Sequence, residues 1–395
     1  MSIADPSQHG LNPFARGVPC CCSSFQQFPQ EVRAKLPNSS NGPEQNLFQN
    51  LQRLQILAAF DRYEVVAMPE GHGMKDIDDF ILLLIRNPAF PQKVNDIAVE
   101  CGNSLYQPIL DRYIAGEEVP FTEVRKVWRN TTQPMCDLSG FYEQLFPLVH
   151  AINLGLPPER RLRVLAGDPP IDWDQIKTSE DREKFAGSRD ESIASIMEKE
   201  VLSKRRKALM LFGTYHLMHG VGHHSAVSIY EEHYPDVTLV IDGFAIFDTS
   251  IFAAWPSPSL ARSKGTWLGA LDITHFYPAQ VYADNDCKVH TVIADEYKKP
   301  MAELVDAFLY LVPRDLALRE QMPADIAVDA GYMTEMIRRA KLAGYPGASN
   351  WTIESMTQYT IDGAEHPLSG IPRNPDPEVL EQDCLARKSG NSKPK

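Results

Sequence analysis

Residues 208–224, ALMLFGTYHLMHGVGHH, join an apolar run to a loop with four histidines within nine positions. A short apolar run that ends at a turn residue is typical of a strand buried on both faces. Segments with helical period separate such runs; in one of them Ile193, Met197 and Val201 fall on one face. This alternation predicts an α/β fold with a mostly parallel sheet and helices on both faces. The other runs lie at 63–68, 96–100, 161–167, 237–243 and 306–311.

The ends of the chain differ in composition from its middle. Residues 1–45 are rich in Pro, Ser, Asn, Gln and Gly, which predicts a disordered or loosely packed leader. We expect one α/β domain over 46–371, with extra helices inserted around 103–155 and 314–345. A flexible tail with a short helix follows over 372–395. PSPSLARSKGT, at 256–266, is expected to be a loop.

The composition excludes several classes of partner. The chain has 395 residues, of which 43% are hydrophobic and 23% charged, and its formal net charge is −13. This charge argues against nucleic acid or an anionic membrane as the main partner. No stretch approaches the roughly 18 consecutive apolar residues that span a bilayer. The N-terminus lacks the basic and apolar regions of a secretory signal, so we expect a cytoplasmic protein without a membrane span.

The seven cysteines form no recognisable framework. Cys20–Cys22 are adjacent within the leader, and Cys101, Cys136, Cys287 and Cys384 are scattered without CxxC spacing. An odd and irregular set is typical of reduced thiols in a cytoplasmic protein.

Polar residues follow four of the expected strands at the point where each strand ends. Carboxyl ends of parallel strands meet at one edge of the sheet, where ligands bind. We therefore expect a convergent site at this edge, with Asn103, Asp168 and Tyr215 contacting a small-molecule substrate. The strand-end residues are Glu70 and His72 after 63–68, Glu100 and Asn103 around the end of 96–100, Asp168 after 161–167, and Tyr215 and His216 after 207–213.

The histidine-rich loop leaves three interpretations open: metal ligands, catalytic bases, or a polar loop in which only His216 is functional. Zinc sites of enzymes use three protein ligands and an open position for water. His72 and His216, together with His223 or a glutamate, could supply such a set. The polar-loop interpretation is the favoured one, with His216 as its functional residue.

Several of these residues resemble one superfamily, which joins the erythromycin esterases, the ChaN-like haem-binding proteins and the TraB/Tiki proteins. Gly213-Thr-Tyr-His216 is an intact GxxH motif. Pro69-Glu-Gly-His72 has proline in place of the glycine but keeps the glutamate of the esterase-like form. Glu100 matches a glutamate that ends the second strand, and Arg189-Asp190 stands where an Arg-Asn or Arg-Asp pair is expected. The motifs span about 60–245, and ECGN, RNTTQ and GDPPIDW resemble features of a bacterial branch near the esterases.

The resemblance implies a shared site but divided activities. Its esterase branch implies a hydrolase with a histidine base, its Tiki branch a metal-dependent protease, and its ChaN branch haem binding without turnover. The residues that it carries over to this site are His72, Glu100, Arg189 and His216.

The first functional hypothesis is hydrolysis of an ester or related acyl bond by activated water. His72 would take the proton, Glu70 and Glu100 would orient it, and Arg189 with His216 would stabilise the oxyanion. No GxSxG motif supports a serine nucleophile, and Cys101 is the one thiol that could act as a nucleophile. No Walker or GxGxxG motif supports a nucleotide cofactor.

The second hypothesis is a haem- or metal-binding protein without turnover, and the third is a catalytically dead scaffold. Tyr215, His216 or the other loop histidines would be the haem ligands, since tyrosine and histidine are both known axial ligands. The cofactor is thus left open between none, a divalent metal such as zinc, and haem.

Overall fold

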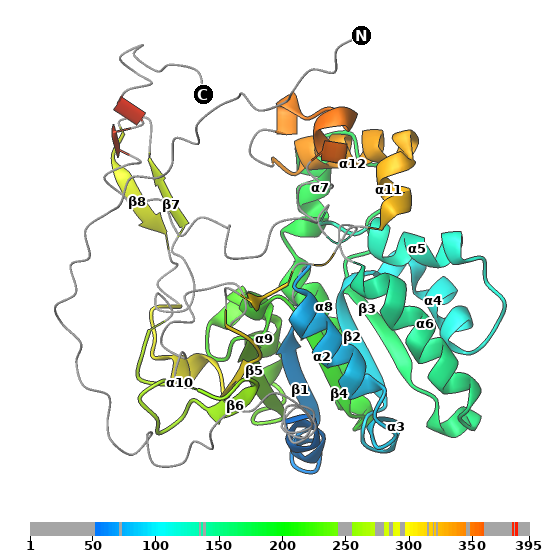
Figure 1. Cartoon of the computed structure of the whole chain (residues 1–395), viewed down its shortest axis with the longest axis vertical. Coiled ribbons are helices and arrows are strands. Elements are labelled where there is room, and N and C mark those ends of the chain that lie inside the picture. Colours follow the sequence, from blue (N-terminus) through cyan, green and yellow to red (C-terminus); the bar gives the residue numbers. More distant parts are fainter. Residues whose placement is uncertain are drawn as a thin grey trace, which may run out of the picture. The chain divides into compact units, whose positions relative to one another are not determined.

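The chain is described by a computed structural model, whose largest feature is a seven-stranded sheet (Figure 1). It describes residues 52–70, 73–133, 136, 140–243, 255–272, 280–283, 287–292, 297–313, 316–318, 320, 323–344, 348–358, 381–382 and 384–385. In sheet order the strands are β3 (Arg163–Asp168), β2 (Asp96–Asn103), β4 (Ala208–Phe212), β1 (Val65–Pro69), β5 (Thr238–Gly243), β9 (Ala307–Tyr310) and β6 (Ser259–Arg262). All neighbours are parallel except β6 and β9.

The predicted α/β fold is confirmed, and each of the six apolar runs contains a strand. The prediction was wrong at 256–266, where β6 pairs antiparallel with β9 instead of forming only a loop. The strand escapes a pattern search because it has four residues, and none of their side chains is fully buried. An edge strand of this kind carries no continuous apolar run.

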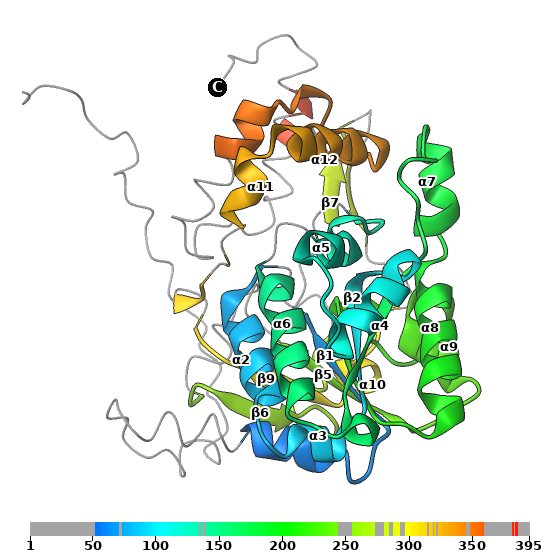
Figure 2. The same cartoon turned by 90° about the vertical axis from the view of Figure 1, so that its right-hand side faces the viewer.

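Helices cover both faces of the sheet because successive side chains of each strand point to opposite faces. In β1, Val66 and Met68 belong to one apolar cluster, and Val65 and Ala67 belong to the other. Residues 52–59 are helical and pack in the first cluster, together with α2 (Lys75–Ile85), α4 (Gln107–Ile114), α5 (Phe121–Arg129) and α6 (Phe141–Leu154). The second cluster contains α8 (Arg189–Glu200), α9 (Ala226–Glu231) and α10 (Met301–Leu304); Figure 2 shows the arrangement from a second side.

Helices are inserted near both predicted places. Those around 103–155 are α4, α5 and α6, while α11 (Ala324–Val328) and α12 (Ala330–Leu342) fall within 314–345. The α11–α12 segment has an apolar cluster of its own and meets the segment after α5 through polar contacts, in which Arg339 donates to the carbonyl of Arg129. The remaining helices and strands are α3 (Phe90–Lys93), α7 (Ser179–Ala186), β7 (Gln280–Ala283) and β8 (Val289–Val292).

The expectation of reduced thiols is wrong for four cysteines. Cys101 is bonded to Cys136, and Cys287 is bonded to Cys384. Each pair is brought together by the fold across 35 and 97 positions of sequence, respectively, so no local spacing could reveal it. Cys20–Cys22 lie outside the described residues, as does the whole of the predicted leader.

In the tail, the structure describes residues 381–382 and 384–385, which are helical and fall within the short helix expected there. The domain boundaries at 45 and 371 stay predictions. In the part of the chain that the structure describes, no helix is long and apolar enough to cross a bilayer.

Candidate functional site

The central strands β4 and β1 lie side by side, but the chain leaves them toward opposite faces of the sheet. After β1 it enters α2 in the first apolar cluster, and after β4 it runs to α9 in the second. Such a reversal is where open α/β sheets bind ligands, at the carboxyl ends of the strands. Four buried acids lie at or just after the ends of neighbouring strands there: Glu70, Glu100, Asp168 and Asp242.

An irregularity in β2 places Glu100. Val99 pairs with Ala166 and Asn103 with Asp168, so the three β2 residues 100–102 lie opposite Gly167 alone. Extra residues in one strand redirect its side chains, which is common beside active sites. The ring of Phe212 packs directly against Gly167, where a Cβ would lie 2.6 Å from it. Glycine at 167 is therefore part of what makes this geometry possible.

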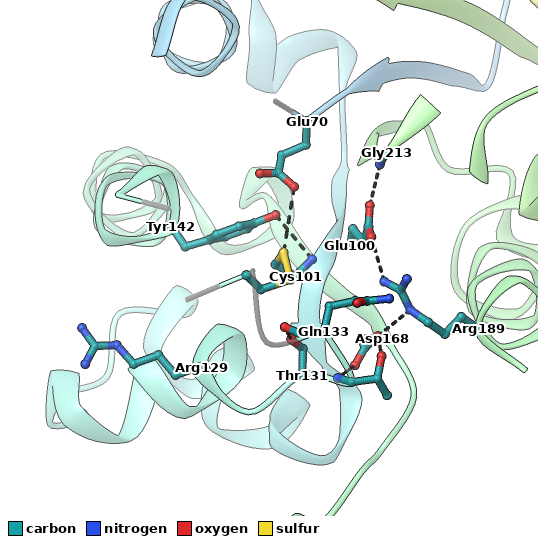
Figure 3. The surroundings of a disulfide bond; sticks show 12 residues. Glu70, Glu100, Cys101, Arg129, Thr131, Gln133, Tyr142, Asp168, Arg189 and Gly213 are labelled. Carbon is teal, nitrogen blue, oxygen red and sulfur yellow. Dashed lines mark hydrogen bonds and ion pairs between the residues drawn. A yellow bond between two sulfur atoms is a disulfide. The ribbon is translucent and has the colours of Figure 1, made fainter. Parts of the chain in front are cut away.

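Arg189 is the cation at the centre of the site (Figure 3). Its Nη2 donates to Glu100 Oε1 at 2.8 Å and its Nε to Asp168 Oδ1 at 3.0 Å, and its side chain is 7% exposed. Burial lowers the pKa of Arg189, but the charges of Glu100 and Asp168 outweigh this, and the pKa is raised. Burial also raises the pKa of the Asp168 carboxyl, although Arg189 and Thr132 act against it. Arg189 is thus a permanent cation held by two carboxylates.

His216 is oriented by a carboxylate from the same helix as Arg189. Its Nδ1 lies 2.7 Å from Asp190 Oδ1, and its Nε2 lies 3.4 Å from Arg189 Nη1 and 3.6 Å from Glu100 Oε1. Because an ionised carboxylate only accepts, the neutral ring carries its proton on Nδ1. This leaves the lone pair on Nε2, the arrangement of a general base with an orienting acid.

A segment after α5 holds Asp168 and Asn103. The backbone N–H and the hydroxyl of Thr132 donate to the two carboxylate oxygens of Asp168 at 2.5 and 2.6 Å. The amide of Asn103 donates to the carbonyls of Asn130 and Ile171 and accepts from the backbone N–H of Leu105. Asn103 and Asp168 are both fully buried, and these contacts bond their polar atoms to the protein. Their predicted substrate-binding roles stay predictions.

Glu70 lies beside the first disulfide. Its Oε2 is 3.9 Å from Cys101 Sγ, and the backbone N–H of Cys101 donates to the Tyr142 hydroxyl. Burial, with the charges of Glu70 and Glu100, raises the pKa of Tyr142 well above its usual value, so Tyr142 is a neutral phenol. Because Cys101 is bonded to Cys136, the suggestion of a free Cys101 thiol as nucleophile is wrong.

The loop histidines point to separate partners. His223 is 73% exposed and lies 3.8 Å from Glu191. His219 lies between Glu231 and Asp306, at 2.7 and 3.0 Å. Gly220 and Gly222 adopt positive φ, which a loop rather than a helix requires. The expected loop is therefore present.

Neither expected cofactor fits the described side chains well. Within the described ranges, no group of three or more His, Cys, Asp or Glu side chains could hold a metal ion. His72, the other predicted ligand and base, lies outside the described residues. To bind haem iron through Nε2, His216 would have to give up the 3.4 Å contact of that nitrogen with Nη1 of Arg189. Burial and Asp242 raise the pKa of Tyr215, which disfavours a tyrosinate ligand.

Three site residues were missing from the predicted site. Asp190 was seen only as part of a motif, although it directly follows Arg189 at the start of α8. Asp242 accepts from the Thr214 hydroxyl at 2.9 Å and stands near the end of an apolar strand, the same signal that identified Asp168. Thr132 could not be found in this way, because it lies outside the strand ends and reaches Asp168 only through the fold.

The chain matches no family model and no curated protein. Solved structures that are similar to it, each at 11% identity, include a Bacillus cereus protein (TM-score 0.43, 71% of this chain and 93% of that chain), a variant of the erythromycin esterase EreC in its open conformation (0.41, 70% and 95%), and ChaN of Campylobacter jejuni with cofacially bound haem (0.30, 49% and 85%). The last two bear the names of an esterase and of ChaN, two of the three branches of the superfamily that the motifs resemble. Values this low carry no argument about activity or ligand, so function is argued from the site alone.

Proposed function

We propose that the chain is a hydrolase of an ester or related acyl bond, in which Asp190 and His216 activate water. The observation that carries this proposal is the 2.7 Å contact between Asp190 Oδ1 and His216 Nδ1, beside a buried arginine. The pair supplies an oriented base, and the arginine supplies a fixed positive charge next to the reacting nitrogen. These are the two parts that water-driven acyl hydrolysis needs.

In the proposed reaction, a water molecule first takes the place of Arg189 Nη1 at Nε2 of His216. Nε2 then takes a proton from this water, and the oxygen of the water adds to the acyl carbon. Arg189 Nη1, 3.4 Å from Nε2, stabilises the oxyanion that forms there. The imidazolium then gives its proton to the leaving oxygen, and an acid and an alcohol are released. Glu100 holds Arg189 in place, which makes Glu100 a positioning residue. His216 takes the role of base that the motif analysis assigned to His72.

Tyr215 is the predicted substrate-binding residue best able to meet a ligand. Its side chain is 41% exposed, and its ring packs edge-on against Tyr297. Asn103 and Asp168 are buried with their polar atoms bonded to protein, so they support the site from beneath. An apolar or aromatic acyl or alcohol group is the chemistry that Tyr215 favours.

The test is hydrolysis of para-nitrophenyl acetate, butyrate and benzoate by the wild type and by Asp190→Asn. We expect saturable release of nitrophenol, reduced roughly 100-fold in kcat/KM by the variant, because the neutral amide no longer stabilises the imidazolium and its NH2 group can turn the imidazole to the wrong tautomer. Glu198→Gln is the matched control, since Glu198 lies on the same helix and contacts His233 in the same way, at 2.8 Å. Equal rates for Asp190→Asn and the wild type would remove the proposed base.

The alternative is a haem- or metal-binding protein of the ChaN type without turnover. The feature that favours it is the 41% exposure of Tyr215, which makes this residue accessible to a ligand; its raised pKa requires that the iron displace the phenol proton on binding. Titration with haem decides between the two: a Soret band that appears at one haem per chain or more, and is lost in Tyr215→Phe, supports the binding protein. Absence of ester turnover together with such a band would replace the hydrolase proposal.

A further inference from the structure

The Cys101–Cys136 disulfide joins the two halves of the site's carboxylate framework. Cys101 directly follows Glu100 in the irregular part of β2, and Cys136 follows the segment that carries Thr132. Both cysteines are buried, with exposures of 0% and 2%. The bond therefore lies beside the site and inside the protein, where it connects the residue next to Glu100 with the segment that binds Asp168.

We propose that the Cys101–Cys136 disulfide is a positioning element of the candidate site, which keeps Thr132 bonded to Asp168 and thereby keeps Arg189 and His216 in place. The expected effect on catalysis rests on the proposed function, whereas the expected effect on the positions of Arg189 and His216 does not. The site is then complete only when these two cysteines are oxidised.

A continuous chain of contacts leads from the cross-link to His216. Thr132 donates twice to Asp168, and Asp168 accepts from Nε of Arg189. Arg189 in turn donates to Glu100, as Figure 3 shows. It also lies against Nε2 of His216. Without the Thr132 contacts, the fully buried Asp168 would keep its bond to Nε of Arg189, and the carboxylate would draw the guanidinium toward itself.

Glu100, the other carboxylate that binds Arg189, also lies next to the disulfide, because it directly precedes Cys101. Its Oε2 accepts from the backbone N–H of Gly213 at 2.5 Å, at the start of the turn that carries His216. Because Cys101 is the next residue in β2, release of its sulfur changes the packing directly beside Glu100. The cross-link thus acts on both carboxylates that hold Arg189.

Other contacts also hold the segment, and three of them are made to its backbone carbonyl oxygens. Asn103 donates to the carbonyl of Asn130, Trp173 Nε1 to that of Thr131, and Arg182 to that of Thr132. These bonds hold the carbonyl groups of the segment in place but do not involve its backbone N–H groups. The N–H and the hydroxyl of Thr132 donate to Asp168. The disulfide at Cys136 limits how far these two donors can move away from Asp168.

The experiment is amide hydrogen exchange, measured residue by residue in the full chain without any substrate. It compares the wild type with Cys101→Ala/Cys136→Ala and with the matched control Cys287→Ala/Cys384→Ala, which removes the second disulfide. The reporters are the amides of Thr132 and Gly213, which donate to Asp168 and Glu100. The reference is the amide of Val240, which donates to Asp306 elsewhere in the sheet.

We expect exchange at Thr132 and Gly213 to become at least about tenfold faster without the Cys101–Cys136 bond, with Val240 unchanged. The control variant should leave the exchange of Thr132 and Gly213 at the wild-type rate. Unchanged exchange at Thr132 would overturn the proposal, because the carbonyl contacts would then suffice. Equal acceleration of all three amides would also overturn it, since the bond would only stabilise the fold as a whole. Acceleration confined to Thr132 would overturn it too, since the effect would not reach Glu100 and the turn that carries His216.

Two single substitutions provide a second test if the Cys101→Ala/Cys136→Ala protein folds poorly. Thr132→Val removes one donor to Asp168, and Thr131→Val removes a similarly buried hydroxyl that donates to Gln133 instead. Faster exchange at Gly213 in Thr132→Val alone supports the proposal, and equal exchange in both variants contradicts it. Where the wild type hydrolyses a nitrophenyl ester, kcat should fall in the Cys101→Ala/Cys136→Ala protein while KM stays the same, because positioning is lost and not substrate binding.

Discussion

Strand β2 carries a buried carboxylate near each end, and the two carboxylates have opposite surroundings. At the amino end, Asp96 lies between two guanidinium groups, with Arg163 at 2.7 Å and Arg206 at 2.6 Å. At the carboxyl end, one guanidinium, that of Arg189, lies between the two carboxylates of Glu100 and Asp168. The same types of side chain thus form two clusters of inverted charge.

The arginine side chains of the two clusters differ in how deeply they are buried. This difference distinguishes a structural ion cluster from a candidate catalytic site. Arg163 and Arg206 are 34% and 30% exposed, so water solvates much of their charge. Arg189 is 7% exposed and has the histidine ring of His216 beside it. Burying an ion cluster costs desolvation free energy. Such clusters are expected at catalytic sites, where a fixed charge stabilises the charge that develops in the transition state. The cluster at the amino end has no histidine among these contacts, and Arg163 extends it to Glu200 at 3.1 Å, so it ties strands and helix together.

Replacing the central cation should have the largest effect. Arg189→Met leaves Glu100 and Asp168 buried beside each other without their counter-ion, and we expect the free energy of unfolding to fall by about 3–5 kcal/mol. Urea unfolding followed by circular dichroism measures it. A loss below about 1 kcal/mol would mean that the carboxylates are solvated or protonated, and the comparison between the two ends would fail.

His219 tests whether a histidine between acids is by itself a sign of chemistry. Burial lowers the pKa of His219, but hydrogen bonds to Asp306 and Glu231 outweigh this and raise it from 6.5 to about 9. Because the folded-state pKa is the higher one, the stabilisation is complete below about pH 6.5 and is lost as the pH rises through about 9.

The expected loss is on the order of 2–3 kcal/mol of unfolding free energy between these two pH values. His219→Gln is the control, since it should lack this part of the pH dependence. A wild type and a variant with the same pH profile would show that His219 is not held as a cation. We expect the variant to keep its ester turnover, because His219 contacts Glu231 and Asp306 and none of the site residues.

A substitution in the cluster at the amino end of β2 should have the smallest effect on the unfolding free energy. In Arg206→Met, Asp96 keeps its bond to Arg163, so we expect a loss of about 1 kcal/mol in unfolding free energy and no change in kcat. Urea unfolding and the nitrophenyl ester assay on the same preparation check both statements. A fall in kcat comparable to that of a carboxyl-end variant would erase the functional difference between the ends.

Much of this comparison was accessible from the sequence because parallel strands obey a simple rule. Their apolar runs are long enough to recognise, and the polar residue that follows each run lies at the common edge. Glu70, Glu100, Asp168 and His216 were found in this way, and the resemblance to a known superfamily added Arg189.

The rest depends on contacts between distant residues. The irregularity in β2, the bond between Cys101 and Cys136, and the attachment of Thr132 to Asp168 arise only when strands and loops approach each other. No periodicity or spacing encodes such contacts, which is also why scattered cysteines suggested free thiols. The strand β6 was missed for a different reason, since a short edge strand buries too little apolar surface to leave a pattern.

The most direct test of the account is the turnover of a nitrophenyl ester by His216→Gln and by His233→Gln. Both histidines contact an acid of α8, His216 at 2.7 Å in the buried site and His233 at 2.8 Å on the surface. We predict that His216→Gln lowers kcat roughly 100-fold or more at an unchanged folded fraction, while His233→Gln stays within about twofold of the wild type. Equal turnover by the wild type and both variants would contradict the claim that the carboxyl end of the sheet performs the chemistry.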